Sequence, residues 1–255
     1  MESMTILEST FEKLPAGANL LFLGEYGSSA HGVNTSDSDF DFIGVAVEPP
    51  SVFHGLDTYE HTLVGDSDTG SRTAAGAEEG KVFALKKFAR LVEGGNTDVL
   101  ASLFLPEYRF MSDAGNFLIQ NRSLFVTLQA IKRFSGHLST ERRRMNGDIR
   151  EKVLRPELIA EFGFDTKAAY QAVKLGFHGR RIARDKTMSI PFTGEERDFI
   201  LAVRAGEITR KEIDEFLEDI VHELDVTEAS DSLPERPDRV RINAVLREIY
   251  RMTDE

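Results

Sequence analysis

The sequence contains no cysteine in its 255 residues. A chain without thiols cannot form disulfides, thiolate metal sites or a cysteine nucleophile, so these kinds of site are excluded. The sequence also lacks any apolar run that approaches the roughly 20 residues of a membrane-spanning helix. Residues 1–10 contain no Lys or Arg, which the start of a secretory signal peptide would carry. We therefore expect a cytoplasmic protein that does not contact membranes.

Positive charge is scarce at both ends of the chain. Residues 1–110 carry 7 basic and 17 acidic side chains, a net charge of −10, and residues 201–255 carry 8 and 15, a net of −7. Residues 111–200 carry 16 basic and 11 acidic side chains, a net of +5, although the whole chain has a net charge of −12. A basic middle segment in an acidic protein indicates either a surface that binds phosphate or an ordinary solvated helix face.

The spacing of apolar residues predicts a small sheet followed by helices. Strands are expected at residues 20–23, 40–47 and 59–64, and residues 65–80 have the composition of a loop. Helical spacing then recurs at residues 82–92, 98–105, 117–144, 167–183, 194–205, 211–223 and 239–252. We predict an α+β protein, in which a small mixed-sheet domain (residues 1–110) precedes an all-helical domain (residues 111–255).

Two carboxylates alternate with aromatic residues in the run Asp39-Phe40-Asp41-Phe42. Residues two apart in a strand face the same side, so Asp39 and Asp41 point one way and the aromatic rings point the other. Two carboxylates this close repel each other unless a cation lies between them. Hard oxygen ligands of this kind suit Mg²⁺, or Mn²⁺ in its place, and such ions can hold the reacting oxygens of a phosphoryl displacement.

A Gly-Ser pair lies shortly before the two carboxylates. Gly27 and Ser28 follow the first expected strand, where a tight turn lets backbone N–H groups approach phosphate oxygens closely. The Ser28 hydroxyl adds one further donor. The sequence thus places a phosphate-binding turn just upstream of a metal-binding pair.

The segment that begins at Gly27 reads GSSAHGVNTSDSDFDFIGV. It resembles the signature of DNA polymerase β-like nucleotidyltransferases, and within them the RlaP family of predicted nucleotidyltransferases associated with RNA repair. Further resemblance to this family lies in Leu85–Asn96, Phe134-Ser135-Gly136-His137, Asp165–Tyr170, Leu233-Pro234 and Pro237-Asp238. The chain departs from the family at Thr97 (usually Pro), Ala101 (often Glu), Gln171 (usually His) and Lys174 (usually Arg).

The resemblance implies a third carboxylate on a later strand. In the superfamily this residue completes the metal site and can accept the proton of the attacking hydroxyl. The family register favours Glu79, and Glu78 and Glu60 are the alternatives. A chain in which none of the three reaches the site would bind nucleotide without turning it over.

One expected helix carries a polar stripe. Its residues are spaced 4, 3, 4 and 3 apart, which places them on one face of a helix. They are Lys167, Gln171, Lys174, His178 and Arg181. We expect Lys167, Lys174 and Arg181 to bind the nucleotide, and the alternatives are contact with the acceptor nucleic acid or a solvated face.

Together these features predict a metal-dependent nucleotidyltransferase. It would transfer a nucleoside monophosphate from a nucleoside triphosphate to an acceptor hydroxyl, an RNA end, and release pyrophosphate. Asp39, Asp41 and Glu79 would hold the metal, and Gly27 and Ser28 would bind phosphate oxygens. Two alternatives stay open: an antitoxin-type enzyme that nucleotidylates a protein hydroxyl, and a non-catalytic module that binds nucleotide or RNA.

Overall fold

A computed structural model describes residues 5–35, 38–65, 77–148 and 155–254. Contacts between residues divide the chain into two compact units. Unit 1 comprises Met1–Gly94, Asp98–Phe125 and Asp238–Glu255, and unit 2 comprises Gly95–Thr97 and Val126–Pro237. The predicted boundary near residue 110 separates two domains that would each fold independently. The two units are defined by contacts alone, so this boundary stays a prediction.

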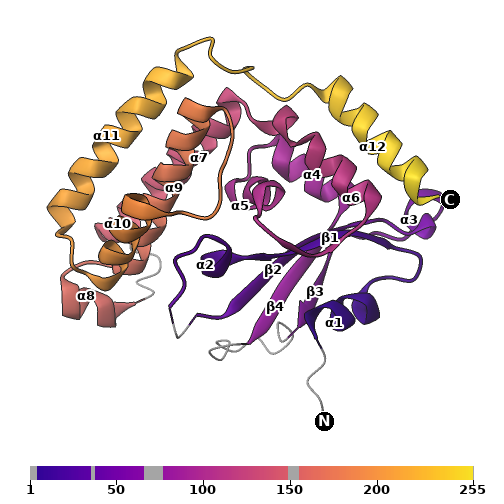
Figure 1. Cartoon of the computed structure of the whole chain (residues 1–255), viewed down its shortest axis with the longest axis horizontal. Helices are drawn as coiled ribbons and strands as arrows, with labels where there is room; N and C mark the ends of the chain where they lie inside the picture. Colours follow the sequence, from indigo (N-terminus) through magenta and orange to yellow (C-terminus); the bar gives the residue numbers. More distant parts are fainter. Residues whose placement is uncertain (1–4, 36–37, 66–76, 149–154, 255) are drawn as a thin grey trace. The chain divides into compact units, whose positions relative to one another are not determined.

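Unit 1 contains a five-stranded mixed sheet with the strand order β3-β4-β2-β1-β5 (Figure 1). The strands are β1 (Asn19–Tyr26), β2 (Phe40–Val47), β3 (His61–Gly65), β4 (Glu78–Ala84) and β5 (Tyr108–Met111). β2 and β4 are parallel, whereas the β1–β2, β1–β5 and β3–β4 pairs are antiparallel. The mixed sheet confirms the predicted α+β class.

Helices and short turns precede, connect and follow these strands. They are α1 (Ile6–Lys13), α2 (Gly27–Ala30), α3 (Pro50–His54), α4 (Leu85–Glu93), α5 (Thr97–Ala101), the 3₁₀ turns η2 (Ser102–Phe104) and η3 (Arg122–Phe125), α6 (Asp113–Gln120) and α12 (Arg239–Thr253). In Figure 1, α4 and α6 lie over one face of the sheet and α1 lies over the other.

The predicted strand at residues 40–47 coincides with β2, and the predictions at 20–23 and 59–64 fall on β1 and β3. The prediction for residues 78–84 was wrong. These residues form β4, because the buried Val82 and Ala84 alternate with the half-buried Lys81 and Phe83 in the period of two that a strand requires. The helix expected from residue 82 begins at Leu85. Of the predicted loop, residues 66–76 lie outside the described residues.

Each face of the sheet buries a different set of apolar side chains. One face packs against α1 through a cluster of Ile6, Leu20, Leu23, Phe42, Ala46, Val64 and Val82. On the other face, Phe22 lies opposite Val45 in the β1–β2 register and contacts Phe88 of α4, with a ring centroid distance of 6.0 Å. Since Val45 and Asp41 are four residues apart on β2, both point to the face that α4 covers.

The last helix, α12, packs within the same unit as the first strands. Glu48, which follows β2, is only 4% exposed. Its carboxylate accepts hydrogen bonds from the Lys86 backbone N–H (2.8 Å) and from the Tyr250 hydroxyl (2.9 Å). The Tyr250 ring also meets Phe53 edge-on, with centroids 5.1 Å apart. A buried carboxylate thus links the start of α4 to α12.

We expect Tyr250→Phe to lower the free energy of unfolding by about 1–3 kcal/mol at neutral pH, because Glu48 loses a buried hydrogen-bond donor. Burial, and then the charge of Glu48, raises the pKa of Tyr250 above its ordinary value of 10.0. The unfolded tyrosine therefore loses its proton before the folded one, and wild-type stability falls as the pH rises above that value. Denaturant unfolding of both proteins at pH 7 and pH 11 should show a smaller difference at pH 11. A difference that widens with pH would contradict this view.

Unit 2 is helical in the residues that the structure describes. Its helices are α7 (Leu128–Met145), α8 (Pro156–Phe162), α9 (Thr166–Asp185), α10 (Gly194–Ala205) and α11 (Arg210–Glu228). α9 packs against α7, α10 and α11, and a Cβ atom added at Gly176 would lie 2.9 Å from Ile220 of α11. The helix predicted at residues 117–144 is in fact two helices, because Thr127 caps a new start of α7 through the Ala130 N–H.

No helix in the described parts of the chain combines the length and the apolar character that crossing a membrane requires.

Candidate metal centre

Parallel pairing of β2 and β4 brings three carboxylates together. In this pairing Asp41 lies directly opposite Glu79, and Asp39 comes immediately before β2. Residues two apart face the same side of a strand, so all three side chains converge at this edge of the sheet. One ligand oxygen from each of Asp39, Asp41 and Glu79 lies within 4.8 Å of the others, and each residue is half-buried.

The donor set fits a hard divalent cation. Three carboxylates at this separation repel one another, and a cation between them relieves the repulsion. Mg²⁺ and Mn²⁺ both prefer carboxylate oxygens. Within the described residues, this is the only group of three or more acidic or histidine side chains that could hold a metal ion. The arrangement therefore supports a divalent metal site, and the choice of ion belongs to the proposal below.

Gly27 lies against one of these carboxylates. Tyr26, the last residue of β1, is paired with Asp41, so the chain turns beside that side chain. Gly27 has φ +71°, in the left-handed region that other residues rarely adopt. A Cβ atom added there would lie 2.2 Å from Asp41 Oδ2. The turn and the carboxylate can occupy these positions only because residue 27 has no side chain.

Hydrogen bonds hold the turn that follows. The His31 ring binds the Gly27 carbonyl through Nδ1, and the ring is 1% exposed. The Val33 N–H donates to the Ser28 carbonyl at 3.0 Å, and the Tyr26 hydroxyl donates to Asp98 at 2.8 Å. These contacts keep Gly27 and Ser28 next to the carboxylates.

The two alternative acids face elsewhere. The Glu78 carboxylate accepts the Ile6 N–H at the start of α1, at 3.1 Å, on the face away from Asp41. Glu60 lies on the surface and pairs with Lys87 at 3.3 Å. Of the three candidates for the third carboxylate, the structure brings Glu79 to the pair, and its catalytic role stays a prediction.

The residues of the stripe on α9 have different surroundings. Lys167 is exposed, whereas Lys174 and His178 are 7% and 2% exposed. The Lys174 ammonium lies 5.6 Å from the Tyr170 ring centroid. Arg181 pairs with Glu196, and its guanidinium lies over the Phe192 ring. A solvated face is therefore wrong for Lys174 and His178, and nucleotide binding by Lys167, Lys174 and Arg181 stays a prediction.

Thr97, one of the departures from the family pattern, contacts His137. The Thr97 hydroxyl and His137 Nδ1 are 2.9 Å apart. His137 belongs to the segment Phe134-Ser135-Gly136-His137, which resembles the family, so a position that departs from the pattern contacts a segment that follows it. The sequence contained both features, but nothing in it indicated that residues 40 positions apart would meet.

Comparison with known proteins agrees with this geometry. The sequence model of a family described as "RNA repair pathway DNA polymerase beta family" matches residues 4–248. A solved structure of a nucleotidyltransferase-like protein from Exiguobacterium sibiricum 255-15 is 12% identical over 94% of this chain and 76% of that chain, with a TM-score of 0.30. No curated protein matches the chain.

Proposed function

Because the chain belongs to the RNA repair pathway DNA polymerase beta family, whose members are nucleotidyltransferases, we propose that it acts on the end of an RNA. In this reaction an acceptor hydroxyl attacks the α-phosphorus of a nucleoside triphosphate. A new oxygen–phosphorus bond forms, the bond to the β-phosphate oxygen breaks, and pyrophosphate leaves. The observation that carries the proposal is the convergence of Asp39, Asp41 and Glu79 beside Gly27.

The three carboxylates share one task in this proposal, and Glu79 has a second. Asp39, Asp41 and Glu79 would hold Mg²⁺, or Mn²⁺ in its place. The bound ion supplies positive charge that neutralises the phosphate oxygens in the transition state. The Glu79 carboxylate also accepts the proton of the attacking hydroxyl. Most of the rate enhancement then comes from positioning and charge neutralisation.

The triphosphate needs partners beyond the metal. Residues 1–110 hold 17 acids and 7 bases, which on balance repel an anion. The backbone N–H groups at Gly27 and Ser28 and the Ser28 hydroxyl supply neutral donors at the carboxylates. We propose that Lys167, Lys174 and Arg181 of α9 supply the opposing charge. Arg181 would exchange its contact with Glu196 for a phosphate oxygen.

The direct test is incubation with each radiolabelled nucleoside triphosphate, Mg²⁺, and a mixture of RNA and protein acceptors. The proposal predicts label on RNA and release of pyrophosphate. Label on protein alone would instead indicate the protein-nucleotidylating alternative. Triphosphate binding without any transfer would indicate the non-catalytic module.

A pair of glutamate variants tests the position of the third carboxylate. We expect Glu79→Gln to lower the transfer rate by about tenfold to a hundredfold while triphosphate binding persists, because Asp39 and Asp41 can still hold a metal. Glu60→Gln is the matched control, because Glu60 pairs with Lys87 on the surface and its loss should change the rate less than about twofold. Single-turnover kinetics and equilibrium binding of both variants make the comparison. A larger loss of rate in Glu60→Gln than in Glu79→Gln would show that the third carboxylate is Glu60, which directly precedes β3.

A further inference from the structure

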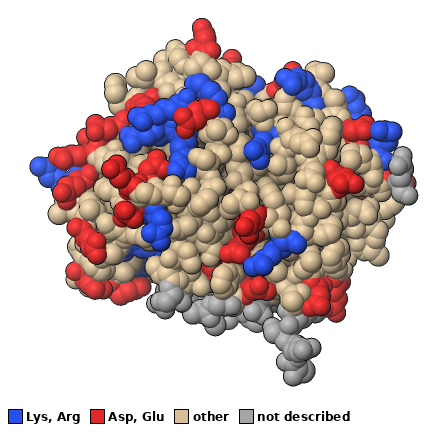
Figure 2. Space-filling model, in the orientation of Figure 1, with Lys and Arg blue, Asp and Glu red and all other residues tan. Residues whose placement is uncertain are grey.

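Two helices of unit 1 concentrate positive charge in an acidic protein. α4 carries Lys86, Lys87 and Arg90 against Glu93, a net charge of +2. α12 carries Arg239, Arg241, Arg247 and Arg251 against Glu248, a net charge of +3. Figure 2 shows Lys and Arg side chains gathered over α12, at the upper right of the view. The chain as a whole has a net charge of −12, so this surface is a local exception.

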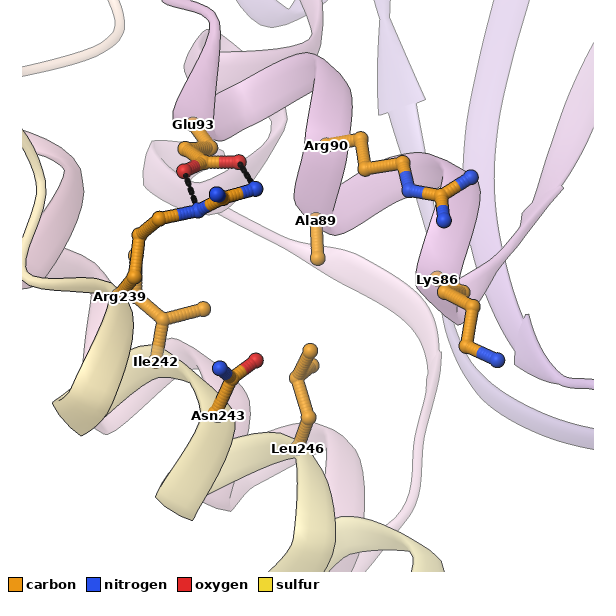
Figure 3. Close-up of a pocket in the computed structure, with 8 residues that line it drawn as sticks. All are labelled: Lys86, Ala89, Arg90, Glu93, Arg239, Ile242, Asn243 and Leu246. Carbon is orange, nitrogen blue, oxygen red and sulfur yellow. Dashed lines mark hydrogen bonds and ion pairs between the residues drawn. The ribbon is translucent and has the colours of Figure 1, made fainter.

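A groove of about 270 Å³ lies between these two helices. Its lining residues are Lys86, Ala89, Arg90, Glu93, Arg239, Ile242, Asn243 and Leu246. Figure 3 shows the Arg239–Glu93 ion pair, with Arg239 Nε and Glu93 Oε1 2.5 Å apart, at one end of the groove and Lys86 toward the other. Among the described residues, neither Lys86 nor Arg90 has a carboxylate partner. The groove therefore combines an apolar floor with a cationic rim.

An aromatic ring extends the groove at its Lys86 end. Phe53 of α3 is 39% exposed, and the Lys86 ammonium lies 5.1 Å from its ring centroid. The Tyr250 ring supports Phe53 edge-on from α12. A partly exposed ring next to cations is the combination on which the bases of single-stranded nucleic acid stack while their phosphates are neutralised.

The groove lies on the same side of the sheet as the three carboxylates. α4 covers the face to which Asp41 points, because Phe88 contacts Phe22 on that face. Strands rise about 3.3 Å per residue, so the step from Glu79 to Ala84 puts the start of α4 roughly 17 Å from Glu79. A polymer that ends at the carboxylates and spans a few nucleotides can reach the groove.

We propose that the groove between α4 and α12 binds the body of a single-stranded RNA acceptor whose end lies at the metal centre. Lys86 and Arg90 bind its phosphates, Arg239 adds a third contact, and Phe53 stacks on a base. The Asn243 side chain offers both a donor and an acceptor to a base edge. This inference rests on the proposed function, because it presupposes an RNA acceptor.

The test uses the full chain and two RNA acceptors, a trinucleotide and an oligonucleotide of about 20 nucleotides. We expect the double variant Lys86→Ala/Arg90→Ala to bind the long RNA at least about tenfold more weakly in fluorescence anisotropy. The slope of log affinity against log salt should become shallower by about 1.4, since each lost single-strand contact accounts for about 0.7. The ratio of transfer to the long acceptor over transfer to the trinucleotide should fall by about tenfold.

Two further variants keep the test specific. Lys87→Ala removes a charge from the same helix, but Lys87 pairs with Glu60 and does not line the groove. The affinity for the long RNA and the ratio of transfer to the two acceptors should therefore stay within about twofold of wild type. Phe53→Ala should weaken RNA binding by about tenfold with little change in the salt slope. If the double variant binds long RNA as tightly as wild type, or the wild-type groove takes up an acidic peptide and not RNA, the proposal fails. If wild type binds long RNA through the groove but transfers no label to it, the proposed function fails and the RNA site stands.

Discussion

Asp41→Asn is expected to abolish nucleotidyl transfer, with a loss of at least about 1,000-fold, while the protein stays folded. The substitution replaces one of the three carboxylates, whose ligand oxygens lie within 4.8 Å of one another, by a neutral amide, so the divalent ion loses an anionic ligand. It also relieves repulsion among the remaining acids, so the metal-free variant should melt at the same temperature as wild type or higher. Transfer assays and thermal melting with and without Mg²⁺ measure both effects. Mg²⁺ should raise the melting temperature of wild type more than that of the variant.

Glu78→Gln is the matched control for this prediction. Glu78 lies next to Glu79 on the same strand, but its carboxylate binds the Ile6 N–H on the opposite face. A glutamine oxygen can still accept that hydrogen bond, so transfer should stay within about threefold of wild type. Full activity in Asp41→Asn would remove the metal assignment. Equal losses of transfer rate in Asp41→Asn and Glu78→Gln would mean that these acids act only through the negative electrostatic potential that they create around the site.

Gly27→Ala is expected to lower the transfer rate by about a hundredfold, because a misplacement of about 1 Å at a reacting centre has an effect of this size. The added methyl group would lie 2.2 Å from Asp41 Oδ2, so either the turn or the carboxylate must move. A left-handed φ also costs an alanine about 1–2 kcal/mol, so the variant should be less stable as well. Single-turnover rates at saturating triphosphate, together with denaturant unfolding, separate the two effects.

Gly163→Ala distinguishes backbone strain from displacement of the carboxylate. Gly163 ends α8 with φ +81°, and a Cβ atom there would have nothing within 4 Å. This variant should therefore lose a similar amount of stability while keeping its transfer rate. Comparable rates in the two alanine variants would show that the contact between Gly27 and Asp41 has no part in catalysis.

The sequence predicts the centre of the site well because local rules determine it. The alternation of acids and rings in Asp39-Phe40-Asp41-Phe42 predicts a strand and the common direction of the two carboxylates, and β2 has the predicted bounds. The composition of residues 65–80 obscured β4, since Glu78, Glu79 and Gly80 have little strand propensity. The strand forms because pairing with β2 buries Val82 and Ala84. Only the resemblance to a family, and not periodicity, favoured Glu79 over its neighbours.

Features that depend on distant segments could not be predicted. The helix stripe on α9 indicated which residues share a face, but burial of Lys174 depends on where the other helices of unit 2 pack. The groove joins residues 86–93 to residues 239–246, which are some 150 positions apart. Charge counting also missed α12, because its net charge of +3 lies within residues 201–255, whose net charge is −7. The net charge of a segment as long as one helix shows this excess of positive charge.

The return of α12 to unit 1 has a consequence for the synthesis of the protein. Residues leave the ribosome in order, at about 5–20 per second, and domains generally fold as soon as they are complete. Unit 1 contains the first strands, yet its Glu48 accepts the hydrogen bond from the Tyr250 hydroxyl only when α12 has emerged. Every residue of unit 2 is translated before that moment. The sheet of unit 1 should therefore be the last part of the molecule to reach its final stability, and β1 and β2 of the nascent chain should stay sensitive to protease until α12 has emerged.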